Sequence, residues 1–239
     1  MTSLAPLSWR CFRAPKAGHT LAEYEDALAV EPATHRFAIA DGASESAFAD
    51  SWARILVESY VLFPGSWSDW LPAARDRWMA EVGDRELPWY AETKVQEGAY
   101  AAMLGIAFKG RRWRATAVGD CCVFQVRGQG LLRGFPIRDA RQFDNRPSLV
   151  GSQKRQAGEP RARRIHANGA LQSGDTVFLM TDALAQWFLK EAEAGQQPWS
   201  RLRSIGTDAQ FVECLTSLRD TKGLRNDDVT MTLIECLPS

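Results

Sequence analysis

The chain has 239 residues, of which 45% are hydrophobic and 24% are charged, and this composition excludes an intrinsically disordered protein. Its 29 basic and 29 acidic side chains cancel, so the protein has no overall field that would attract nucleic acid or an anionic membrane. Five cysteines without paired spacing, and no apolar window as long as a membrane span, predict a cytoplasmic protein with reduced thiols.

The N-terminal region carries two short apolar runs, at residues 27–30 and 36–40, which predict two strands joined by a turn. Glu25 and Asp26 precede the first run, and Asp41 ends the second. If the strands pair as a hairpin, these three acids lie at the same end of it. The segment before them, residues 1–20, is predicted to be irregular, with an edge strand that could begin near Trp9.

Asp41 is followed by Gly42 and then by a long amphipathic pattern over residues 47–63, which predicts a strand-to-helix junction. A glycine at such a junction allows backbone and ligand to approach closely, because it has no Cβ. Asp-Gly is also a common turn pair, so this dipeptide alone does not separate a turn from a ligand site.

The middle of the chain changes from helical to strand patterns. Two further helices are predicted over residues 70–81 and 89–97. Short apolar or alternating runs, punctuated by glycines, then predict an antiparallel meander of four strands at residues 101–108, 113–118, 123–126 and 131–135.

Asp120 follows a strand and a glycine, Gly119, within this meander. The polar stretch 136–168 after it is predicted to be an excursion with only short elements. Long insertions in a compact domain are commonly functional, so a flap over a site is one interpretation and a spacer is the other.

The C-terminal third repeats the opening arrangement. A strand is predicted at residues 176–180, followed by Asp182 and a helix over residues 184–194. A second helix is predicted at 208–219, and a final alternating strand starts directly after the acid pair that begins with Asp227.

Several aspartates at strand ends, in a chain with only three histidines, have the chemistry of a site for a hard divalent ion. Clustered carboxylates repel one another unless cations neutralise them. Two such ions about 3.5–4 Å apart could activate water for in-line attack on phosphorus. Asp182 and Asp227 could instead simply cap a helix and a strand.

These residues together resemble the motifs of the metal-dependent protein phosphatases of the protein phosphatase 2C type, as in a divergent bacterial member. The resemblance runs in order through the whole chain. The matching segments are Glu25-Asp26-Ala27, Asp41-Gly42, Val118-Gly119-Asp120-Cys121, Leu171 to Asp182 and Asp227-Asp228-Val229-Thr230.

The resemblance implies one α+β domain over residues 1–239, a four-layer α-β-β-α sandwich of two antiparallel sheets flanked by helices, with the flap at 136–168. It also implies two Mg²⁺ or Mn²⁺ ions, a phosphoserine or phosphothreonine protein substrate, a monomer and a signalling role. The expected metal ligands are Asp41, the Gly42 carbonyl, Asp182, Asp227 and Asp120. The expected catalytic residues are Asp41, Glu25 and Asp26.

The chain also departs from the family pattern. The family often has His-Gly-Gly after Asp-Gly, and residues 43–45 here are Ala-Ser-Glu, so the proton for the leaving group must come from water or from another group such as Glu45. Leu21 stands where a phosphate-binding Arg often lies, which leaves Lys16 and His19 as the phosphate-binding candidates. Gln186 replaces an Asp that many relatives use for a third ion, so a third ion is left open.

Two alternatives follow from these departures. One is a binding or regulatory module of the same fold in which catalysis is weakened. The other is a phosphatase that acts on a small phosphorylated metabolite.

Overall fold

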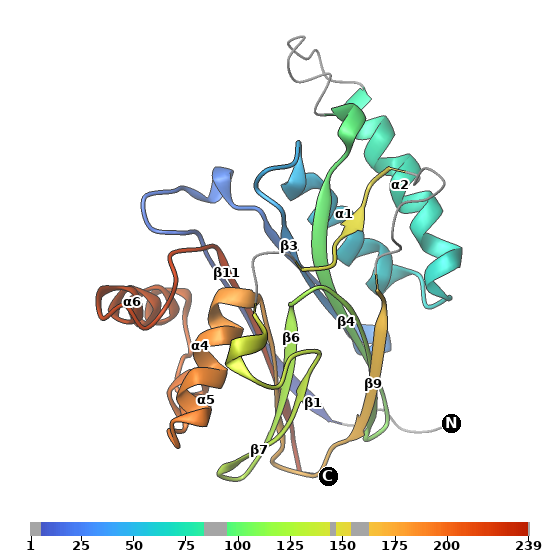
Figure 1. The fold of residues 1–239 in the computed structure, drawn as a ribbon. Coiled ribbons are helices and arrows are strands. Elements are labelled where there is room, and N and C mark those ends of the chain that lie inside the picture. The colour runs from blue at the N-terminus through green and yellow to red at the C-terminus, as the bar shows by residue number, and fades with distance from the viewer. Residues whose placement is uncertain (1–5, 84–94, 144–146, 154–162, 239) are drawn as a thin grey trace.

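Two antiparallel sheets packed face to face form the centre of the protein, and helices cover both outer surfaces (Figure 1). The computed structural model describes residues 6–83, 95–143, 147–153 and 163–238. The predicted α+β sandwich of four layers is therefore confirmed.

The strands divide between the sheets without regard to their order in the chain. One sheet holds, in spatial order, β1 (Leu7–Ala14), β11 (Val229–Cys236), β10 (Thr176–Met180), β6 (Cys122–Arg127) and β7 (Gly130–Phe135). The other holds β2 (Asp26–Glu31), β3 (Arg36–Gly42), β4 (Tyr100–Lys109), β5 (Arg112–Val118) and β9 (Ile165–Ala170), and β8 (Val150–Gly151) pairs with β4.

Three apolar cores follow from the alternation of side chains along these strands. In β3, Phe37 and Ile39 belong to the core between the sheets, whereas Ala38 and Ala40 belong to the core beneath helices α1 (Ala49–Leu62) and α2 (Trp67–Gly83). Strands buried on both faces read as continuous apolar runs, which is why these segments were predictable.

The opposite outer surface is covered by helices α4 (Asp182–Glu193), α5 (Pro198–Arg203) and α6 (Asp208–Asp220) (Figure 1). Strand β10 alternates in the same way as β3. Its Phe178 and Met180 pack under these helices, and its Val177 and Leu179 face the other sheet. Short 3₁₀ turns at Leu21–Glu23, Pro32–Thr34 and Ala140–Gln142 complete the described elements.

One sequence prediction about the strands is wrong, and another is confirmed in part. The edge strand expected near Trp9 is β1, which lies at the edge of its sheet and pairs along its whole length with β11, so residues 7–14 are not irregular. The four strands from β4 to β7 do not form one meander, because the chain crosses from one sheet to the other between β5 and β6. The turn pattern indicates antiparallel neighbours but does not reveal this change of sheet.

Two further differences concern shorter segments. Helix α5 and strand β9 were not predicted, and β9 takes up the end of the expected 136–168 excursion. Most of the predicted helix at 89–97 lies outside the described residues. Its described part, residues 95–97, is helical.

Candidate metal centre

The strand ends bring aspartates from both sheets to one place. Asp26 on β2 and Asp41 on β3 are direct partners in the antiparallel register, so their side chains lie on the same face. Asp41 follows the alternation of Phe37 and Ile39, which belong to the core between the sheets. The two carboxylates therefore lie at the end of the space between the sheets.

Asp26 links this end of its sheet to the opposite sheet. Its carboxylate accepts hydrogen bonds from the Oγ1 atoms of Thr181, after β10, and Thr230, on β11, each at 2.9 Å. The residue is buried, and the Tyr24 hydroxyl in turn contacts Thr230. Asp26 is thus held by hydroxyl donors and has the surroundings of a positioning group.

Asp41 lies among other carboxylates of the group. Burial raises its pKa well above the ordinary range, and the charges of Asp26, Asp182, Asp120 and Asp227 raise it further. The pKa of Asp26 is also raised well above its usual value, chiefly by burial. These shifts indicate a concentration of negative charge that a cation would relieve.

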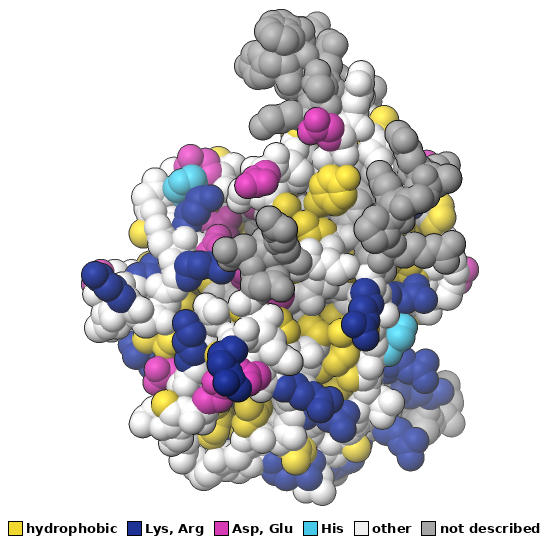
Figure 2. Space-filling model, viewed as in Figure 1, with side chains coloured by type: hydrophobic (Ala, Val, Ile, Leu, Met, Phe, Trp, Pro, Cys, Tyr) yellow, Lys and Arg dark blue, Asp and Glu magenta, His cyan; other side chains and the backbone are white. Residues whose placement is uncertain are grey.

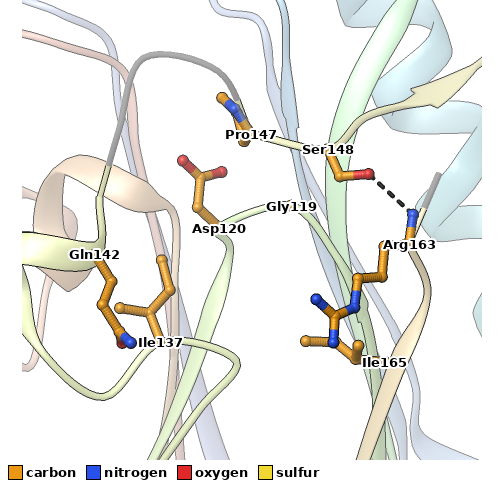
Figure 3. Close-up of a pocket in the computed structure, with 8 residues that line it drawn as sticks. All are labelled: Gly119, Asp120, Ile137, Gln142, Pro147, Ser148, Arg163 and Ile165. Carbon is orange, nitrogen blue, oxygen red and sulfur yellow. Dashed lines mark hydrogen bonds between the residues drawn. The ribbon is translucent and has the colours of Figure 1, made fainter. Parts of the chain in front are cut away.

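Asp120 enters the group from the turn between β5 and β6, where Gly119 has φ +91°. A Cβ at Gly119 would lie 2.5 Å from the Ala102 Cβ, so only glycine fits this turn. Asp120 is buried and borders a cavity of about 210 Å³ (Figure 3).

The cavity beside Asp120 has polar and apolar walls. Gln142 and Ile137 lie on one side of it, and Arg163 and Ile165 on the other (Figure 3). The backbone N–H of Arg163 donates to Ser148 Oγ at 3.0 Å, which joins two segments of the predicted flap.

Asp182 and Asp227 approach the group from the other sheet and share one basic partner. Asp182 is the first residue of α4, and Asp227 lies in the loop before β11. Arg225 Nη2 donates to Asp182 Oδ2 and, at 2.9 Å, to Asp227 Oδ2. The Asp182 Oδ1 atom is buried and has no hydrogen-bond partner in the described structure.

Sequence reasoning assigned no separate role to Asp228, which has a structural one. Its two carboxylate oxygens each accept a hydrogen bond of 2.8 Å, one from the backbone N–H of Lys16 and one from that of Glu25. Asp228 thereby ties the segment before β2 to the start of β11. The sequence did contain a signal for this role, because two adjacent acids, Asp227 and Asp228, allow one to bind a ligand and the other to hold the backbone.

The other predicted site residues lie around this group. The Glu25 carboxylate accepts a hydrogen bond from Ser44 and lies 4.0 Å from Lys16 Nζ. His19 Nδ1 instead lies 3.6 Å from Glu23 Oε1. Lys16 is thus adjacent to a predicted catalytic acid, whereas His19 pairs with a different glutamate.

Gly42 is required by the packing at the junction of β3 and α1. A Cβ there would lie 2.7 Å from the carbonyl oxygen of Glu25 and 2.9 Å from that of Ala49. The Gly42 N–H donates to the Glu25 carbonyl at 3.2 Å. The absence of a side chain therefore keeps Asp41 close to Glu25.

The donor chemistry of the group fits a hard divalent ion, since its members are carboxylates and one carboxylate oxygen, Asp182 Oδ1, is buried without a partner. Within the residues that the structure describes, no three His, Cys, Asp or Glu side chains are placed to hold a single ion. The acids converge on one region, and the Arg225 guanidinium joins two of them, Asp182 and Asp227.

The surface and helices add two observations. Figure 2 shows basic and acidic side chains scattered over the same face of the molecule. Among the described helices, none combines the length and apolar character that crossing a membrane requires.

Comparison with known proteins gives a family match over most of the chain. The family model described as protein phosphatase 2C matches residues 22–218. No curated protein matches significantly.

Solved structures with the same fold are distant in sequence. The serine/threonine phosphatase PstP/Ppp of Mycobacterium tuberculosis is 16% identical, with a TM-score of 0.67 over 97% of this chain and 99% of that one. Stp1 of Staphylococcus aureus is 14% identical, with a TM-score of 0.65 over 98% and 97%. The catalytic domain of PstP in complex with 2 manganese ions is 17% identical, with a TM-score of 0.63 over 97% and 99%.

Proposed function

Because the chain belongs to the protein phosphatase 2C family, we propose that it hydrolyses phosphoserine or phosphothreonine in protein substrates with two Mg²⁺ or Mn²⁺ ions. The observation that supports this most is the group of aspartates drawn from both sheets, in which Asp41 is surrounded by four further acids. Such a concentration of carboxylates, of which Asp26 and Asp120 are buried, is unfavourable in a metal-free protein and favourable around divalent ions.

The residues proposed to hold the ions are Asp41, the Gly42 carbonyl, Asp182, Asp227 and Asp120. Bound ions of this type act as Lewis acids and lower the pKa of water, which supplies a nucleophile at neutral pH. The related phosphatase domain crystallised with 2 manganese ions supports the choice of metal.

Asp26 and Glu25 are proposed to support the reaction without binding the ions themselves. Asp26 accepts two hydroxyl hydrogen bonds and so fixes the end of β2 beside Asp41. Glu25 lies beside Lys16, whose ammonium group would attract the phosphate of a substrate. A proton for the leaving group would come from water or from the exposed Glu45.

The cavity beside Asp120 supports a substrate larger than phosphate alone. Its volume of about 210 Å³ and its mixed lining would accept part of a peptide next to the acids. We therefore place the phosphorylated side chain at the aspartates and the flanking peptide toward Gln142 and Arg163.

The experiment is hydrolysis of a phosphothreonine peptide and of an aryl phosphate, with MnCl₂ and with EDTA. We expect turnover that requires the metal and is lost in Asp41→Asn. Asp69→Asn is the matched control, because Asp69 is an exposed acid at the start of α2. Turnover no higher than that of Asp41→Asn would contradict the proposal, and turnover of the aryl phosphate alone would favour a small-molecule substrate.

A binding or regulatory module is the second candidate, and the ion pairs of Arg225 favour it. A guanidinium between Asp182 and Asp227 neutralises part of the site without a metal. In that case calorimetry with MnCl₂ would detect no binding, while a phosphopeptide would still bind.

A further inference from the structure

Arg225 lies in the loop between α6 and β11, where sequence reasoning assigned it no role. Its Nη2 group donates to Asp182, which lies 43 residues earlier in the chain, and to Asp227, which lies 2 residues later. Both acids are among the proposed metal ligands. The same guanidinium therefore neutralises carboxylates on two different elements.

The burial of the three groups shows how the contact is arranged. The Asp182 side chain is 12% exposed, whereas those of Arg225 and Asp227 are 43% and 39% exposed. The arginine thus covers the inner acid from the solvent side. It occupies only one oxygen of Asp182, because Oδ1 remains buried without a partner.

Physical chemistry gives this arrangement a consequence for metal binding. Charge-assisted hydrogen bonds from a guanidinium are about twice as strong as neutral ones. Arg225 holds Oδ2 of both acids and leaves Asp182 Oδ1 open. A divalent ion that binds these carboxylates must therefore either displace the guanidinium or bind beside its positive charge, and both lower the affinity for the ion.

We infer that Arg225 is a built-in counter-cation that holds Asp182 and Asp227 in the metal-free protein and competes with divalent ions for their oxygens. The inference rests on the proposed function, because it assumes that these aspartates bind metal. It goes beyond that function because it gives Arg225 two effects: the arginine lowers the affinity of the site for metal, and it stabilises the site when no metal is bound.

The test measures Mn²⁺ binding by isothermal titration calorimetry in the unmodified 239-residue chain and in two variants of it, Arg225→Gln and Arg225→Lys. We expect Arg225→Gln to bind Mn²⁺ about tenfold more tightly, which corresponds to about 1.4 kcal/mol. Arg225→Lys should fall between it and the unmodified protein, because an ammonium keeps the charge but loses the planar fork. Thermal unfolding in EDTA gives a second measurement, in which Arg225→Gln should have the lower Tm.

Arg54→Gln is the matched control. Arg54 is 40% exposed and pairs with Glu58 on α1 and Glu81 on α2 rather than with a proposed metal ligand. Its substitution also removes ion pairs and a charge, so it should lower the Tm in EDTA without changing the Mn²⁺ affinity.

The outcomes separate the inference from the proposed function. If Arg225→Gln binds Mn²⁺ with the affinity of the unmodified protein, or more weakly, the competition is refuted and the metal site stands. If none of the proteins binds Mn²⁺, the metal site itself is refuted, and the competition with it. An equal gain in affinity in Arg54→Gln would show a general charge effect and would also refute the inference.

Discussion

The charge of Asp41 is expected to have two opposite effects: it destabilises the metal-free protein, and it binds the metal. The substitution Asp41→Asn tests both. The substitution keeps the shape of the side chain and removes its charge. Burial, followed by the charge of Asp26 and of three further acids, raises the pKa of Asp41 well above its usual range. For an acid with a raised folded-state pKa, stability is lost as the pH rises above the unfolded value, near 4. At neutral pH the metal-free protein should therefore become more stable when the charge is removed.

The magnitude follows from the register of β2 and β3. Asp26 and Asp41 are directly opposed, and such residues have Cβ atoms about 5 Å apart. At an effective dielectric constant of about 20, two unit charges at that distance repel by roughly 3 kcal/mol. Proton uptake relieves part of this repulsion, so we expect a gain of about 1–2 kcal/mol. In a chain of this length that gain raises the Tm by roughly 2–8 °C.

The assay is thermal unfolding of both proteins in EDTA and in MnCl₂. In EDTA, Asp41→Asn should unfold at the higher temperature. A ligand at 100 times its Kd stabilises the folded state by about 2.7 kcal/mol, and only the unmodified protein should gain this stabilisation. The order of the two Tm values should then reverse in MnCl₂.

Two results would refute this reasoning. Asp41→Asn could be the less stable protein in EDTA, which would mean that the Asp41 carboxylate is satisfied without metal. It could also be stabilised by MnCl₂ as much as the unmodified protein, which would mean that Asp41 is not a metal ligand. Asp76→Asn, which removes an exposed charge in the middle of α2, should change neither Tm by a comparable amount.

Three further predictions concern single features. Asp175→Asn should cost about 1–3 kcal/mol in urea unfolding at pH 7, because it breaks the ion pair with Arg127. Burial raises the pKa of Asp175, but its hydrogen bonds outweigh this and lower it overall, so the cost should shrink as the pH falls below about 4. Gly42→Ala should reduce turnover about tenfold or more, since its Cβ would meet the Glu25 carbonyl at 2.7 Å and displace Asp41. Mn²⁺ affinity, measured by calorimetry, should continue to rise with pH above about 4, the ordinary carboxylate range, because binding releases protons from carboxylates whose pKa is raised. An affinity independent of pH would contradict this.

The convergence of acids could be predicted from the sequence because it depends on local patterns. Asp41 ends an apolar run, and the alternation that buries Phe37 and Ile39 between the sheets carries Asp41 to the same face. Asp182 follows another such run on the opposite sheet. Strand periodicity and motif order were sufficient to predict that these acids meet, and their mutual effect on pKa agrees with this.

Arg225 could not be predicted, because its direction depends on tertiary contacts. A long flexible side chain in a polar loop has no periodicity, and its partner Asp182 lies 43 residues earlier. Strand β9 was missed for a different reason. It is an edge strand with one exposed face, and its alternating residues include Gly169 and Ala170, which give a weak apolar signal.

The acid pair at the start of β11 shows how the fold divides one motif into two roles. Asp228 is buried, and both of its oxygens accept backbone hydrogen bonds from the segment before β2. Asp227 is 39% exposed and makes its ion pair with Arg225, a contact that a competing cation can replace. Removal of the Asp228 carboxylate would leave two backbone donors from the segment before β2 without partners, whereas removal of the Asp227 carboxylate would free only the neighbouring N–H of Asp228. Both oxygens of Asp228 are therefore committed to joining distant segments, whereas Asp227 makes one local hydrogen bond and one exposed ion pair, and this difference leaves Asp227 as the one available to a ligand.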